Sequence, residues 1–241
     1  MKIIERIKNL SKDHFCERAI TIGFIGDSVT QGCFEVYRNC EKENGITTQY
    51  RSLNAYHNKL KKIFETVYPE VPVNIINAGI SGDNSMAGYE RLHRDIISFN
   101  PDLAVVCFGL NDVSRGADAI NIYTESLDKI FCALSEAEIE TIFMTPNMMN
   151  TYALYEEQDK IIHEIMEKVA ELQNSGVMDM YMDASREICK KHNIPVCDCY
   201  AKWKKLYENG VDVTRLLSIK HPTDEMHWLF ASSLFEKIMG F

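Results

Sequence analysis

The chain has 241 residues, of which 46% are hydrophobic, and it carries a formal net charge of −9. Its length fits one large domain or two small ones, at roughly 100–200 residues per domain, and its apolar share suffices for an ordinary buried core. The acidic balance argues against a nucleic-acid or anionic-membrane partner, because such surfaces are bound through basic patches. Composition identifies no other partner and leaves the oligomeric state open.

The N-terminus and the cysteines bear on location. Residues 1–10 alternate charged and apolar side chains and lack the apolar run of about 7–15 residues that a signal peptide needs. No apolar stretch approaches the roughly 20 residues that cross a bilayer. Eight cysteines without an export signal indicate free thiols, so we expect a cytoplasmic protein. Cys197 and Cys199 share one face of a predicted strand, and core packing is favoured there because no further metal ligands are evident.

Apolar runs alternate with helical segments along the whole chain. In chain order we predict a helical extension at 1–18, strand 19–25, helix 49–68, strand 73–77, helix 85–98, strand 103–108, helix 119–137, strand 141–145, helices 155–174 and 178–193, strand 195–199 and helix 225–239. The strands are continuous apolar runs, which is typical of a parallel sheet covered by helices on both faces. We therefore predict one doubly wound, three-layer α/β domain over 1–241. Its five-stranded parallel sheet should have the flavodoxin-like order 2-1-3-4-5.

In such a fold, ligands bind beyond the carboxyl ends of the strands. The first strand is followed by Gly26-Asp27-Ser28-Val29-Thr30. A serine at this strand-to-helix corner exposes its hydroxyl to the cleft, and its N–H can point at a developing oxyanion. The alternative is a helix N-cap, since Asp and Ser both cap well.

Two more segments follow strands two and three. Gly79 and Gly82 allow close backbone approach to a ligand, and Gly82 can present a free N–H. Asn111 offers two side-chain N–H donors that suit an oxyanion hole. Both segments also have a plain interpretation as turns, which Gly, Asn and Asp favour for local reasons.

A histidine precedes the last predicted helix. The neutral imidazole of His221 can take a proton from a serine and return it to a leaving group. Pro222 biases His221 toward an extended conformation, which keeps it on the loop. A lone histidine usually has a structural role. His221, however, supplies the base that would act together with the candidate nucleophile Ser28 and the candidate oxyanion donors.

Four short motifs occur in order along the chain, namely Gly-Asp-Ser (26–28), Ser-Gly-Asp (81–83), Gly-Leu-Asn-Asp (109–112) and His-Pro (221–222). Together they resemble the four conserved blocks of the SGNH/GDSL hydrolase family, over residues 25–231. The resemblance implies Ser28 as nucleophile and His221 as base. It also implies an oxyanion hole made by the Ser28 N–H, the Gly82 N–H and the Asn111 side chain, with no metal and no organic cofactor.

One position departs from that pattern. The family usually has an aspartate three residues before the histidine, where this chain has Ser218. An Asp-x-x-His sequence exists at 224–227, which leaves His227 as a second candidate base, although His221 is preferred. If His221 is the base, its orienting group is either a backbone carbonyl or another carboxylate, the candidates being Asp198, Asp212 and Asp224.

The implied activity is hydrolysis of small carboxylic esters through an acyl-serine, with a small-molecule ester as the partner. Two segments are expected to select the substrate. The polar loop 33–48 offers Glu35, Tyr37 and Arg38 to a hydroxylated group, so O-acetyl groups on carbohydrates are favoured. The segment 146–155 contains Met148 and Met149, either as an adaptable acyl pocket or, more simply, as core packing.

Other functions remain as alternatives: a catalytically silent protein of the same fold, or a lipase or thioesterase for longer acyl chains. A nucleotide-binding module is disfavoured because neither a G-x-x-x-x-G-K-[ST] loop nor a G-x-G-x-x-G turn is present. An α/β-hydrolase is disfavoured because its G-x-S-x-G elbow is absent.

Overall fold

The computed structural model describes residues 1–42 and 45–241. A parallel sheet lies at its centre, with the strands in the order β4-β1-β5-β6-β7. Their bounds are β1 (Ile20–Gly26), β4 (Val73–Gly79), β5 (Leu103–Cys107), β6 (Glu140–Met144) and β7 (Val196–Cys197). Counted along the chain, this order is 2-1-3-4-5, so the predicted flavodoxin-like topology is confirmed.

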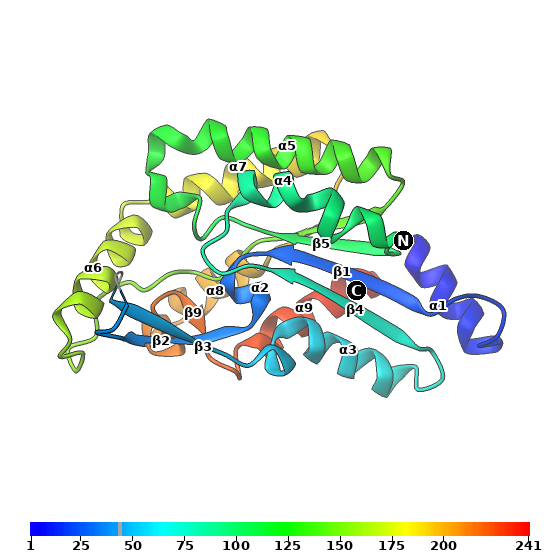
Figure 1. The fold of residues 1–241 in the computed structure, drawn as a ribbon, viewed down its shortest axis with the longest axis horizontal. Coiled ribbons are helices and arrows are strands. Elements are labelled where there is room, and N and C mark those ends of the chain that lie inside the picture. The colour runs from blue at the N-terminus through cyan, green and yellow to red at the C-terminus, as the bar shows by residue number, and fades with distance from the viewer. Residues whose placement is uncertain (43–44) are drawn as a thin grey trace.

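Helices cover both faces of the sheet (Figure 1). One face carries α4 (Ser85–Asp95), α5 (Ile120–Glu136) and α7 (Val177–Lys191), and the other carries α3 (Tyr56–Val67), α8 (Cys199–Glu208) and α9 (His227–Met239). All five residues of β5 are buried, because this strand is covered on both sides. The helix α8 was not predicted, and only its first residue, Cys199, falls within the predicted strand 195–199.

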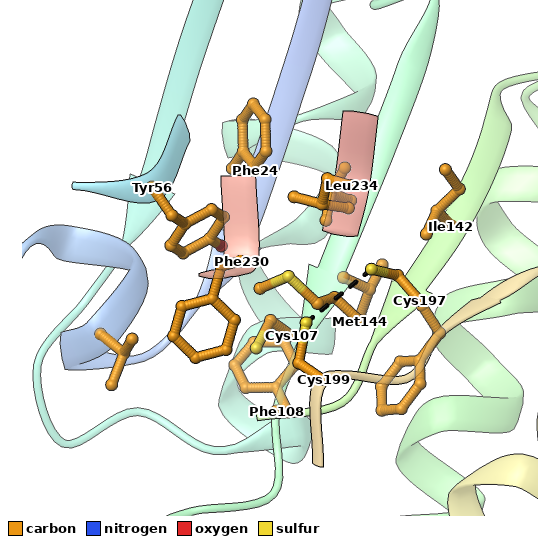
Figure 2. Packing of buried hydrophobic residues seen from close by; sticks show 14 of the residues in the cluster. Phe24, Tyr56, Cys107, Phe108, Ile142, Met144, Cys197, Cys199, Phe230 and Leu234 are labelled. Carbon is orange, nitrogen blue, oxygen red and sulfur yellow. Dashed lines mark hydrogen bonds between the residues drawn. The ribbon is translucent and has the colours of Figure 1, made fainter. Parts of the chain in front are cut away.

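Large side chains fill the space between the sheet and α3, α8 and α9, as Figure 2 shows. Phe24 packs edge-on against Tyr56, which in turn packs against Phe230. Cys197 and Cys199 are both buried in this core with their sulfur atoms 3.8 Å apart. The prediction that they lie on one strand was wrong, because β7 ends at Cys197 and Cys199 begins α8.

The N-terminal helix α1 (Lys2–Lys12) belongs to the same hydrophobic cluster. Ile3, Ile7 and Leu10 recur at helical spacing and are all buried, as expected for an amphipathic helix. The expected extension over 1–18 is therefore helical as far as Lys12. None of the helices in the described part of the chain has the length and apolar character to cross a bilayer.

The segment 33–48 is not a loop. It contains an antiparallel pair, β2 (Cys33–Arg38) and β3 (Ile46–Tyr50), and its positions 43–44 lie outside the described residues. β-branched and aromatic residues favour strands, which the prediction overlooked among the polar ones. The predicted helix 49–68 consequently starts too early, because α3 begins only at Tyr56. Likewise, α6 (Lys160–Asn174) begins after its N-cap Asp159 rather than at 155.

Several short elements complete the chain. They are α2 (Ser28–Gln31), a second hairpin of β8 (Leu217–Ser218) and β9 (His221–Pro222), and the 3-10 turns η1 (Ser52–Asn54), η2 (Ile97–Phe99), η3 (Val113–Arg115), η4 (Ala117–Ala119) and η5 (Val213–Leu216). In Figure 1, β2, β3, β9 and α6 lie at the same end of the sheet. This is the end at which the functional site is expected.

Candidate active site

Ser28 begins α2 directly after β1. The carboxylate of Asp27 caps this short helix by accepting a hydrogen bond from the Val29 N–H at 2.9 Å, as N-cap residues do. The end of β4 passes so close to α2 that a Cβ on Gly79 would lie 2.2 Å from the backbone nitrogen of Gln31. Glycine is therefore required there, and it lets the second predicted segment reach the serine.

His221 meets Ser28 across 193 residues of sequence. The serine Oγ lies 2.8 Å from His221 Nε2, and both residues are buried. The other ring nitrogen, Nδ1, lies 3.1 Å from the carbonyl oxygen of Ser218. Because a carbonyl can only accept, we assign the proton of the neutral imidazole to Nδ1. Nε2 then carries a lone pair that can accept a hydrogen bond from the serine hydroxyl.

Burial lowers the pKa of His221 to about 4, and the nearby positive charge of Lys220 lowers it further in the same direction. The carbonyl oxygens of Ser218 and Ile219 act in the opposite sense, because they accept hydrogen bonds from the ring. The imidazole is thus neutral near pH 7, which is the form that a general base needs.

The three carboxylates considered for orienting His221 all bind elsewhere. Each is held by another side chain: Asp198 by Arg186 at 2.9 Å, Asp212 by the Tyr152 hydroxyl at 2.6 Å, and Asp224 by Lys59 at 2.5 Å. In the described residues none of them bonds to His221. The backbone carbonyl of Ser218 holds the ring instead.

His227 is placed differently from His221. It is fully buried, and its Nδ1 accepts the backbone N–H of Tyr56 at 3.0 Å. Aromatic rings of Phe34 and Phe230 pack against it. Burial lowers its pKa to about 3. His227 is therefore a core residue that anchors the start of α3, and the geometry favours His221 as the base.

Two of the three predicted oxyanion donors, Asn111 and Gly82, are linked by one hydrogen bond to the residue that follows Gly82. Asn111 Nδ2 donates to the carbonyl of Asp83 at 2.7 Å, which fixes the amide next to Gly82. Among the residues that the structure describes, its second N–H has no other acceptor. Gly82 has a φ of +80° in the turn that presents its N–H. Within residues 1–42 and 45–241, neither the Ser28 N–H nor the Gly82 N–H donates to another group of the protein. Both remain available to a ligand.

Two buried residues that the sequence analysis did not single out hold these segments together. Arg91 of α4 donates to the carbonyls of Gly26 at 3.0 Å and Ala78 at 2.6 Å, and it also binds Asp83. It thereby ties the ends of β1 and β4. Asp112 accepts the N–H and the hydroxyl of Ser85. The buried Arg91 guanidinium binds four acceptor groups, the fourth being the Asp95 carboxylate at 3.1 Å, and no spacing in the sequence signals this role.

Lys220 is a further residue that the sequence analysis missed. Its Nζ donates to the side-chain oxygen of Asn111 at 2.7 Å and to the carbonyl of Leu110 at 3.2 Å. Its only signal in the sequence is its place directly before His221. The structure therefore links the histidine hairpin to the third predicted segment.

The candidate substrate residues fall into two groups. Met148 and Met149 are buried in the core cluster, so they are packing residues. Glu35, on β2, forms an ion pair with Arg51 at 3.1 Å. Next to these two lies a cavity of about 430 Å³ between the two hairpins, whose lining includes Phe34, Glu35, Arg51, Asn54, Ser218 and Asp224.

One group of side chains has a composition that could suit a metal ion. Asp128, Cys132 and His192 bring their ligand atoms within 4.8 Å of one another on α5 and at the end of α7. However, His192 and the ammonium of Lys191 already bind the same oxygen of Asp128. The cluster acts as an ion pair between two helices.

A parallel α/β sheet with a serine–histidine pair at the carboxyl ends of its strands defines a serine hydrolase. Residues 24–229 match the model of the GDSL-like lipase/acylhydrolase family. The chain therefore belongs to that family, and it is an ester-hydrolysing enzyme. This confirms the resemblance drawn from the four motifs.

Known relatives agree with this placement. The chain is 25% identical over 224 residues to an acetylxylan esterase of Geobacillus stearothermophilus, covering 89% of this chain and 92% of that protein. It is also 25% identical over 139 residues to an arylesterase of Vibrio mimicus, covering 55% and 68%. The solved structure of Axe2, an acetylxylan esterase from Geobacillus stearothermophilus, superposes with a TM-score of 0.67 at 22% identity, covering 92% of this chain and 94% of that one.

Proposed function

We propose that Ser28 is the nucleophile of this esterase, that His221 is its general base, and that Gly82 and Asn111 supply oxyanion donors beside the Ser28 N–H. The observation that carries the assignment is the 2.8 Å contact between Ser28 Oγ and His221 Nε2. This contact joins two residues that are 193 positions apart in the sequence. In the described residues, the serine hydroxyl has no other hydrogen-bond partner.

The chemistry follows from these positions. His221 Nε2 takes the proton as Ser28 Oγ attacks the acyl carbonyl carbon. The tetrahedral oxyanion is stabilised by the backbone N–H groups and the Asn111 amide. The protonated imidazole then gives its proton to the leaving alcohol, and an acyl-serine remains. Water, deprotonated by the same histidine, releases the acid and restores Ser28.

We propose a small ester of a hydroxylated compound as the substrate, with O-acetyl groups on carbohydrates as the favoured class. The cavity beside the histidine hairpin is lined by Glu35, Arg51, Asn54 and Asp224, which can hydrogen-bond to hydroxyl groups. Such polar side chains favour a hydroxylated substrate over a long acyl chain. The acetylxylan esterase relative supports the same class.

A single domain over 1–241 and a cytoplasmic location also remain proposals. The first is supported by the burial of α1 in the common core. The second is supported by the cysteines, all eight of which are free thiols, as is usual in a reducing compartment.

The central test compares Ser28→Ala with the surface variant Ser98→Ala. Turnover of p-nitrophenyl acetate should fall to background in the first and stay unchanged in the second, with equal melting temperatures. A fluorophosphonate probe should label the native chain at Ser28. Undiminished turnover by the folded Ser28→Ala variant would refute the assignment. A series of p-nitrophenyl esters from acetate to palmitate, followed by acetylated xylo-oligosaccharides, tests the substrate class.

A further inference from the structure

The turn that carries His221 has an unusual backbone. Ile219 and Lys220, the two residues between β8 and β9, have φ values of +40° and +57°. Two-residue hairpin turns of this kind normally use Gly, Asn or Asp, and a β-branched residue at positive φ is strained. Such strain persists only where the surroundings impose it.

Two asparagines from the segment after β6 impose this conformation on Lys220. The Lys220 N–H donates to Asn150 Oδ1 at 2.8 Å, and the Lys220 carbonyl accepts from Asn147 Nδ2 at 2.8 Å. Both asparagines are buried. The backbone of Lys220 is thus held at both its donor and its acceptor, which sets the direction of its side chain.

That side chain ends on the Asn111 amide. The ammonium donates to Asn111 Oδ1 at 2.7 Å, while Nδ2 donates to the Asp83 carbonyl at 2.7 Å. An ammonium can only donate, so it selects the amide orientation in which the oxygen faces the lysine. The N–H groups then face Asp83 and Gly82. A flipped amide would direct its oxygen toward the place where an oxyanion forms.

The charge of Lys220 is not cancelled by a direct ion pair. Within the described residues, its hydrogen bonds go to oxygen atoms of an amide and of a backbone carbonyl. Burial lowers the pKa of Lys220, and the negative charges of Asp27 and Asp112 act in the opposite sense by favouring its charged form. A charged donor on the amide oxygen draws electron density from the amide nitrogen, and charge-assisted hydrogen bonds are stronger than neutral ones.

We propose that Lys220 is a positioning residue of the esterase, which orients and polarises the Asn111 amide for the oxyanion and so acts on the transition state through Asn111. The inference rests on the proposed function of Ser28, His221 and Asn111. It also gives the strained turn a role, because this backbone directs the lysine to the amide while His221 contacts the serine.

The test is a double-mutant cycle with Lys220→Met and Asn111→Ala, measured on p-nitrophenyl acetate. Loss of one oxyanion donor lowers kcat by on the order of 10²–10³-fold. We expect Lys220→Met alone to lower kcat roughly 10–100-fold with KM within threefold, because the amide remains but is no longer oriented. If Lys220 acts through Asn111, the double variant should be no slower than Asn111→Ala.

Lys220→Arg should recover most of the rate, because it keeps a charged donor, and the exposed Lys160→Met should match the native enzyme. Full additivity of the two losses, or a change in KM alone, would overturn the inference. If Lys220→Met does not fold, the rates of Lys220→Gln, which lacks the charge, and Lys220→Arg, which keeps it, are compared instead. Equal rates for these two folded variants would also contradict the proposed role. Failure of the proposed function is recognised separately, by a Ser28→Ala variant that still turns over.

Discussion

The ring of His221 donates through Nδ1 to the carbonyl oxygen of Ser218, its cross-strand partner in the β8–β9 hairpin, at 3.1 Å. The backbone carbonyl of Ser218 therefore orients the ring of the proposed base. The family usually has an aspartate at this position, whose carboxylate would orient the ring instead. The side chain of Ser218 forms a different hydrogen bond. Its Oγ accepts a hydrogen bond from the Val36 N–H of β2 at 3.2 Å.

The first prediction concerns Ser218. Replacing Ser218 by Ala leaves the carbonyl in place, so we expect kcat to remain within about threefold of native. Stability should fall by about 1 kcal/mol, because the Val36 N–H loses its acceptor. Steady-state kinetics and urea unfolding measure the two effects. A loss of kcat above 100-fold would mean that the hydroxyl, not the carbonyl, orients His221.

A second prediction separates the two C-terminal histidines. His221→Gln should lower kcat by at least about 10³-fold, because the general base is lost. His227→Gln should leave kcat within a few-fold but lower the free energy of unfolding by roughly 1–3 kcal/mol, since a buried, hydrogen-bonded ring is replaced. The reverse pattern would assign the base to His227.

The third prediction is the pH profile of kcat/KM. The proposed base acts in its neutral form, and burial lowers the pKa of His221 to about 4. We therefore expect kcat/KM to stay high down to acidic pH and to fall as the pH drops through about 4. Lys220 is the charged group that acts directly on the ring, and Asp27 and Asp112 act in turn on Lys220. Removing the positive charge with Lys220→Met should move the acidic limb to higher pH. An acidic limb near 6.5 in the native enzyme would contradict the burial of the imidazole.

Acid stability provides a fourth prediction, through His57. This residue is buried, and burial lowers its pKa to about 4 from the 6.5 of an exposed histidine. The unfolded chain takes up the proton first as the pH falls. The stabilisation is therefore complete above pH 6.5 and declines toward pH 4, by about 3 kcal/mol for this shift.

Urea unfolding at pH 7 and pH 4.5 measures this effect. His57→Gln should lose less stability between the two pH values than the native chain does. Asp27 works in the opposite sense, because burial raises its pKa to about 6 and its neutral form is favoured in the folded state. An identical pH dependence in His57→Gln and the native chain would show that His57 contributes nothing.

Part of this protein is determined locally in its sequence. Continuous apolar runs such as 103–107 are typical of strands covered on both faces in a parallel sheet. Their alternation with helical segments, together with the number of five strands, predicted the strand order. The order of the motifs around Ser28, Gly82, Asn111 and His221 placed the candidate site, because the carboxyl ends of parallel strands share one edge.

Tertiary structure decided the rest. The contact that orients His221, the role of Lys220 and the core position of His227 all depend on atoms brought together from distant segments. Asp198, Asp212 and Asp224 were equally plausible partners in sequence, and only packing shows that each binds elsewhere. The physical reason is range: hydrophobic periodicity is a property of neighbouring residues, whereas a hydrogen bond needs two groups within about 3 Å after the whole chain has folded.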